Sequence, residues 1–269
     1  MECTPSRGRC LAASLADVSE DVLLLVGEAC SDPLAPRMLV NLAATSHQTL
    51  ATLQPTLNEL HQFQREMKAL WSKERLRRDF SSMFKTTAVS WYRSGLTTAD
   101  LNVFGRLLQM GELGALKVLS LRRNEISDGG MQALFAAVSS GSLGQLNELD
   151  LSNNCIGDEG IKAFSTAISS GSMANLVDLQ LWGNAIGDEG MEAFASAIAM
   201  ESLDRLRSLS LFRNQIGDGG ISSIASAIAS GALPSLRFLS FVVDAVGLTI
   251  DPEHPQLTAA CESRRIRFS

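Results

Sequence analysis

The residue types that do chemistry in enzymes stand apart from one another in this sequence. The three histidines, His47, His61 and His254, are isolated, and each fits a surface or packing role better than that of a base or a ligand. The five cysteines are scattered without a CxxC pair, so a metal site is not expected. The sequence has no nucleophile elbow, phosphate-binding loop or paired-carboxylate motif. We therefore expect a protein that is not an enzyme and that has no cofactor or metal.

Residues suited to the recognition of another protein recur at a spacing of 30 positions. Trp182 and Phe212 are equivalent in this spacing, and Arg213 follows the second of them. Aromatic and arginine side chains dominate the energetics of protein interfaces. The same spacing brings further candidates beside them: acidic Glu148, Asp150 and Asp178, and toward the N-terminal side Tyr92, Arg93, Arg122 and Arg123. We expect these residues to bind a partner with complementary charges; the alternative is that the C-terminal segment folds back over the aromatic pair.

A repeated segment between Leu116 and Val246 must position these residues. Each copy contains Leu-x-x-Leu-x-Leu-x-x-Asn-x-Ile and then an aspartate, and the copies begin at Leu116, Leu146, Leu176 and Leu206, with a degraded fifth at Leu236. The alternating leucines predict a short strand, and the apolar residues after the aspartate have helical spacing. One strand–helix unit cannot bury its own apolar side, so we expect the units to stack on one another.

Two polar positions of the repeat are predicted to be structural. The asparagines are expected to satisfy backbone groups of the turn after each strand: Asn124, Asn154, Asn184 and Asn214. The aspartates are expected to be helix N-caps: Asp128, Asp158, Asp188 and Asp218. Glycines suited to a left-handed helix end follow at Gly141, Gly171 and Gly231, and Glu201 takes this place in the third repeat.

The motif LxxLxLxxNxI followed by an aspartate, as in Ile156-Gly157-Asp158, resembles the leucine-rich-repeat family of the ribonuclease-inhibitor-like subtype. The resemblance implies an α/β fold, a right-handed solenoid or horseshoe with a parallel sheet on its concave side and helices on its convex side. Proteins of this family typically bind other proteins. Because the leucines of each strand point inward, the residues between and after them are expected on the concave side.

The sequence suggests three parts. Residues 1–14 are expected to be a disordered tail, residues 15–85 a helical domain, and residues 86–269 the repeat domain with a cap at each end. An amphipathic helix is expected within residues 56–85, with its apolar side formed by Leu60, Phe63, Met67, Leu70 and Trp71. Residues 86–113 are expected to be a divergent first repeat and residues 264–268 a final strand, giving about six strands.

The short apolar helices expected in residues 15–50 resemble an F-box. The features that match are Asp21-Val22-Leu23 and Met38-Leu39, whereas the usual Leu-Pro opening is Val18-Ser19 here. An F-box would bind a Skp1-type adaptor of a ubiquitin ligase and leave the repeats to present a substrate. The alternative is that these helices only cap the array.

Charge and composition narrow the class of partner. The net charge is −6, and from Thr86 onward we count 13 basic against 19 acidic residues, so the repeats carry the imbalance. An acidic solenoid is a poor binder of phosphate backbones, so nucleic acid is not expected as a partner. No apolar run approaches the ~20 residues that cross a bilayer, so a membrane is not expected either. Scattered cysteines favour a reduced compartment, the cytoplasm or the nucleus.

We therefore predict a non-enzymatic protein-interaction module that binds a partner protein on the concave side, with the substrate receptor of a ubiquitin ligase as one specific role. Other roles stay open. The module could regulate an enzyme, as a GTPase activator or a ribonuclease-inhibitor-like blocker, or be a structural subunit of a larger complex.

Overall fold

The computed structural model describes residues 47–73, 86–109, 113–136, 138, 143–200, 202–241 and 254–268. The chain divides into two compact units, Met1–Ala69 and Leu70–Ser269. The predicted tail, most of the F-box-like segment, Gly141 and Glu201 lie outside the described residues.

The helix before the repeats, α4, spans His47–Ser72, so it begins earlier than the sequence pattern indicated. Its last turn belongs to the second unit, and there Leu70 and Trp71 are buried. The Trp71 ring meets the Trp91 ring edge-on at 6.3 Å between centroids, and Trp91 meets Phe104 in the same way at 4.9 Å. These rings close the first strand–helix layer of the second unit. No helix of the described residues is long and apolar enough to cross a membrane.

The second unit alternates short strands with helices. Its strands are β1 Ala88–Ser90, β2 Val118–Ser120, β3 Glu148–Asp150, β4 Asp178–Gln180, β5 Ser208–Ser210, β6 Phe238–Ser240 and β7 Arg267–Phe268. Its helices are α5 Thr98–Gln109, α6 Asp128–Phe135, α7 Asp158–Ser169, α8 Asp188–Ile198, α9 Asp218–Ala229 and α10 Pro255–Ser263.

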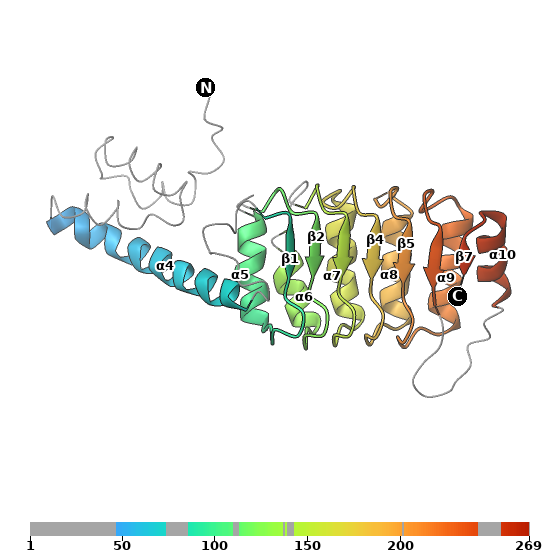
Figure 1. Cartoon of the computed structure of the whole chain (residues 1–269), viewed down its shortest axis with the longest axis horizontal. Coiled ribbons are helices and arrows are strands. Elements are labelled where there is room, and N and C mark those ends of the chain that lie inside the picture. Colours follow the sequence, from blue (N-terminus) through green and yellow to red (C-terminus); the bar gives the residue numbers. More distant parts are fainter. Residues whose placement is uncertain are drawn as a thin grey trace, which may run out of the picture. The chain divides into compact units, whose positions relative to one another are not determined.

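The described strands form one parallel sheet in the order β1 to β7, so every strand pairs with its neighbour in the chain. Successive strands up to β6 pair at a register of 30 residues, as Leu119 pairs with Leu149 and Leu149 with Leu179. Figure 1 shows the helices together on one side of this sheet. The predicted α/β solenoid with a parallel sheet is confirmed, with seven described strands rather than about six. We call the side of the sheet without helices the open face.

The core lies between the sheet and the helices. The repeated leucines, such as Leu149 and Leu151, are buried, and so are the helix residues Phe164 and Phe194. The rings of Phe164 and Phe194 stack at 6.2 Å between centroids, which joins α7 to α8. Burying each such side chain stabilises the fold by about 1.5–3 kcal/mol. Stacking therefore supplies the buried area that a single repeat lacks.

The asparagines link each turn to the turn before it. Asn154 Nδ2 donates to the carbonyls of Leu151, at 2.8 Å, and of Leu121, at 3.1 Å. Its Oδ1 accepts from the backbone N–H of Ile126 at 3.2 Å and of Asn124 at 3.0 Å. One amide thus satisfies backbone groups in two repeats, and Asn124, Asn184 and Asn214 donate to the equivalent carbonyls.

The prediction that the aspartates are N-caps is wrong by one position. The N-caps are Ser127, Gly157, Gly187 and Gly217, and the aspartates begin the helices. The carboxylates of Asp128, Asp158 and Asp188 instead reach the next repeat, where Asp128 Oδ1 accepts from the N–H of Gly157 at 2.7 Å and of Gly160 at 2.9 Å. A Cβ atom on Gly160 would lie 2.7 Å from that oxygen, so this glycine makes room for the link.

The glycines at the ends of α7 and α9 have the backbone conformation that was predicted. Gly171 has φ 76° and Gly231 has φ 109°, values in or near the left-handed region that favours glycine.

Candidate functional site

The open face presents three rows of side chains that cross the strands. The register of the sheet aligns the first row: Ala88, Val118, Glu148, Asp178, Ser208, Phe238 and Arg267. It also aligns the middle row: Ser90, Ser120, Asp150, Gln180, Ser210 and Ser240. Backbone hydrogen bonds between the segments that follow the strands align a third row, which we call the aromatic row: Tyr92, Arg122, Ser152, Trp182 and Phe212.

The aromatic row is continuous across β2 to β5. The rings of Trp182 and Phe212 stack with 4.9 Å between centroids and 7° between planes, and both side chains are partly exposed. The Arg122 guanidinium lies 4.8 Å from the Trp182 ring centroid and 5.8 Å from that of Tyr92. The sequence indicated a basic region apart from the aromatic pair. The structure brings Arg122 and Trp182 together.

The small size of Ser152 makes the contact between Arg122 and Trp182 possible. Ser152 stands between Arg122 and Trp182 in the row, is fully buried, and donates its hydroxyl to Asp150 Oδ1. Its short side chain leaves Arg122 free to span the two strand spacings, roughly 10 Å, to the indole. A guanidinium over an indole is attracted by about 0.5–2 kcal/mol. Arg122 Nε is buried and has no hydrogen-bond partner among the described residues, and the guanidinium lies between the Tyr92 and Trp182 rings.

Arginines also follow members of the aromatic row directly in the chain, and their backbone is in the left-handed region. Arg93, Arg123 and Arg213 have φ of 50°, 56° and 54°, at the repeat position where Asn153 and Gly183 stand in the other two repeats. This region costs most residues about 1–3 kcal/mol, and glycine and asparagine are the residues that tolerate it.

Two of these arginines contact rings of the aromatic row. Arg123 donates to the Tyr92 hydroxyl at 3.1 Å, and its guanidinium lies 5.9 Å from the Tyr92 ring centroid. The Arg213 guanidinium lies 6.0 Å from the Phe212 ring centroid.

The predicted acidic residues lie on β3 and β4. Glu148 and Asp178 are register partners on these strands and belong to the first row. Asp150 accepts from the Ser152 backbone N–H at 3.0 Å, and Asp178 accepts from Gln180 Nε2 at 2.5 Å. Among the described residues the ion pairs join Lys73 to Asp100 and Lys162 to Glu159 and Glu189, so these three acids are not neutralised there.

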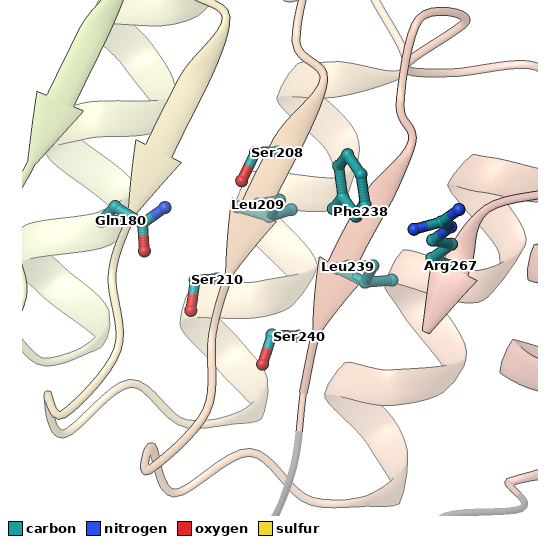
Figure 2. Close-up of a pocket in the computed structure, with 8 residues that line it drawn as sticks. All are labelled: Gln180, Ser208, Leu209, Ser210, Phe238, Leu239, Ser240 and Arg267. Carbon is teal, nitrogen blue, oxygen red and sulfur yellow. The ribbon is translucent and has the colours of Figure 1, made fainter. Parts of the chain in front are cut away.

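The C-terminal part of the open face is hollowed. A hollow of about 610 Å³ is lined by Gln180, Ser208, Leu209, Ser210, Phe238, Leu239, Ser240 and Arg267 (Figure 2). Phe238 is 51% exposed, and the Arg267 guanidinium lies 5.6 Å from its ring centroid. Neither Phe238 nor Arg267 was predicted from the sequence to belong to the binding site. The 30-residue spacing aligns Phe238 with Glu148 and Asp178, so the same spacing could have identified Phe238.

A model of the family described as "Leucine Rich repeat" matches residues 116–135, 146–165, 172–195 and 206–225. The chain carries leucine-rich repeats. A comparison with curated protein sequences found no match.

Two solved structures are among those to which this chain is similar. "Leiomodin-1 Actin-Binding Site 2 (ABS2)" is 17% identical, with 63% of this chain and 93% of that chain covered and a TM-score of 0.45. An internalin (inlF) from Listeria monocytogenes is 18% identical, with 67% and 52% covered and a TM-score of 0.32. The chain thus spans about half of the internalin chain.

The open face of the repeats presents side chains that can contact another molecule. Within the described residues there is no group of three or more His, Cys, Asp or Glu side chains that could hold a metal ion. His61 lies on α4 and His254 precedes α10, so neither belongs to the rows of the open face. What the open face does present is stacked rings, guanidinium groups, hydroxyls, and carboxylates that form no ion pair within the described residues.

Proposed function

We propose that this chain is a non-enzymatic protein-interaction module that binds a partner protein on the open face of its leucine-rich repeats. Leucine-rich repeats generally bind proteins, and the aromatic row is the observation that carries the proposal. Trp182 and Phe212 are stacked and partly exposed, with Arg122 on the indole. Large rings and arginines at the centre of a surface are the composition of an interface hot spot.

The stacked pair is ordered before any partner arrives. Because the rings already contact each other and Arg122, little side-chain freedom remains to be lost on binding. The strained backbone of Arg213 supports the same proposal, since glycine or asparagine would be more stable at this position and would lack the guanidinium.

The charges of the open face favour one orientation of the partner. The proposed contact residues are Trp182, Phe212, Arg213, Tyr92, Arg122, Arg123, Glu148, Asp150 and Asp178. The arginines lie along the aromatic row and the acids lie toward the first row, so a partner with the opposite arrangement is attracted in one register and repelled in others.

The specific cellular role is a further step of the proposal. The role of substrate receptor rests on the F-box-like sequence of residues 15–50, which would bind a Skp1-type adaptor in the cytoplasm or nucleus. A regulator of an enzyme, such as a GTPase activator or a ribonuclease-inhibitor-like blocker, or a structural subunit would need only the repeats. Capture with the full chain and with Leu70–Ser269 separates these roles, because an adaptor that binds residues 15–50 is captured by the full chain alone.

The test of the interaction itself compares captured proteins. The full chain and its Trp182→Ala/Phe212→Ala variant are used as baits in an extract of the native cell. Met200→Ala is the matched control, because Met200 is 71% exposed and follows α8, away from the open face. We expect a partner that the wild type and the control retain and the double variant loses. Equal capture by all three baits would show that the aromatic row is not the binding surface.

A further inference from the structure

We propose that the first row of the open face binds a protein segment that carries a basic side chain and, about 14 Å away, a carboxylate. The inference rests on the proposed function, and it specifies the chemistry of the partner. The two ends of the row carry opposite charges: an acidic pair on β3 and β4, and an arginine on β7.

The acidic end has two carboxylates side by side. Glu148 and Asp178 are register partners on adjacent strands, so their backbones lie about 4.8 Å apart. Neither forms an ion pair with another described residue, and Asp178 has one oxygen engaged by Gln180. Like charges at this separation repel each other. A lysine or arginine of a partner would relieve that repulsion.

The basic end has a guanidinium held in place by a ring. Arg267 is the register partner of Phe238, with its guanidinium 5.6 Å from the ring centroid. Arg267 is exposed and forms no ion pair within the described residues. Contact with the ring restricts the side chain before binding, so less freedom is lost when a carboxylate arrives.

The hollow between these ends supplies further donors. It is lined by the hydroxyls of Ser208, Ser210 and Ser240, for which no hydrogen bond appears within the described part of the chain. In Figure 2 Ser208 and Ser210 lie on β5 and Ser240 lies on β6, and Phe238 stands between Ser208 and Arg267. A carboxylate that pairs with Arg267 can accept from a hydroxyl of this hollow, while Phe238 offers an apolar contact to the neighbouring residue of the partner.

Arg267 is not needed to close the array, because Arg264 already has that role. The Arg264 guanidinium donates to the carbonyls of Ile228, Ala232 and Leu233, which belong to the end of α9 and the turn after it. Arg267 makes no comparable side-chain bond among the described residues. Its charge is therefore available to another molecule.

The register of the sheet fixes the distance between the two charges. From Asp178 the row passes Ser208 and Phe238 to Arg267, which is three strand spacings or about 14 Å. An extended chain advances about 3.3 Å per residue, so the distance corresponds to roughly four residues. The expected segment is extended, crosses the strands, and has opposite charges four residues apart.

A peptide selection tests this inference. Phage that display random 12-residue peptides are selected on the full chain. We expect enrichment of peptides with a basic and an acidic residue four positions apart, in either order along the peptide. Arg267→Glu should weaken a selected peptide at least tenfold, and the same peptide with its acidic residue changed to lysine should recover binding to this variant.

The matched control is Arg265→Glu, which makes the same charge change two residues away and outside the row. It should leave peptide binding unchanged, and thermal unfolding should show that both variants are folded. Peptides that need Trp182 but ignore Arg267→Glu and Asp178→Lys would overturn this inference and leave the proposed function standing. Selection of no peptide, or of peptides without the spaced charges, would overturn it as well.

Discussion

At the residue scale, Arg213 combines a strained backbone with a side chain beside the aromatic row. Arg213 has φ 54° and Gly183 has φ 69° at the same position of the repeat, so the turn itself demands the left-handed region. An arginine in this conformation costs more than a glycine, and the Arg213 guanidinium lies 6.0 Å from the Phe212 ring centroid. Under the proposed function, contact with a partner accounts for an arginine at this position.

Arg213→Gly should separate the two effects. Relief of the backbone strain should raise the free energy of unfolding by up to about 1 kcal/mol, while the loss of the guanidinium should weaken partner binding. Denaturant unfolding and binding of the captured partner measure the two changes. A variant that is clearly less stable than the wild type would show that Arg213 has a packing role.

Asn154→Ala should be strongly destabilising, because it leaves carbonyl and N–H groups of two buried turns without partners. We expect a loss of about 2–3 kcal/mol in the free energy of unfolding, measured by denaturant titration. Asn147→Ala is the control, since Asn147 is exposed, and it should change stability by less than about 0.5 kcal/mol. Similar losses in both variants would contradict the role given to the Asn154 amide.

At the scale of the elements, carboxylates link neighbouring repeats, whereas the N-caps of α6 to α9 make no side-chain capping hydrogen bond. Helices α6, α7 and α8 each begin with an aspartate whose carboxylate accepts from backbone N–H groups at the start of the next helix, as Asp188 does from Gly217 at 2.6 Å and from Gly220 at 2.9 Å. The negative charge lies at the positive ends of two helix dipoles. This arrangement explains the glycines on either side of the aspartate, which a capping role alone does not.

Gly160→Ala should test this link between elements. The new Cβ would lie 2.7 Å from Asp128 Oδ1, so we expect a loss of about 2 kcal/mol in the free energy of unfolding. Gly129→Ala, at the start of α6, meets nothing closer than 4.0 Å and should be neutral or stabilising by up to about 1 kcal/mol. In an Asp128→Ala background the cost of Gly160→Ala should shrink, and full additivity of the two changes would argue against a direct contact.

Much of this fold was predictable because the repeat has a fixed length. A spacing of 30 residues sets both the register and the residues that share a row, so the neighbourhood of Trp182 and Phe212 followed from the sequence. The contact between Arg122 and Trp182 did not, because it spans two strands and depends on the small size of Ser152. The N-caps were misplaced because the aspartate pattern is the same for a cap and for a link to the next repeat.

At the scale of the whole chain, the second unit combines a rigid array with a charged surface. The net charge of the chain is −6, yet its open face carries arginines along the aromatic row and acids toward the first row, and no ion pair joins them within the described residues. Such charges contribute little to folding and mainly govern the rate and orientation of association.

Partner binding should therefore weaken as salt rises, while the fold remains stable. Between about 0.05 and 0.5 M salt the Debye length falls from roughly 14 to 4 Å, which screens exposed charges. We expect a lower association rate for the captured partner, with little change in the melting temperature. An association rate that is independent of salt would show that the charged groups of the open face do not guide the partner.

The central claim is that the partner covers the aromatic row, and site-specific photocrosslinking tests it most directly. A photoreactive phenylalanine analogue at Phe212 is compared with the same analogue at Met200, in the full chain bound to the captured partner. We predict a crosslink to the partner from position 212 and none from position 200. A crosslink from position 200 alone would place the partner on the helical side of the array and contradict the proposed function.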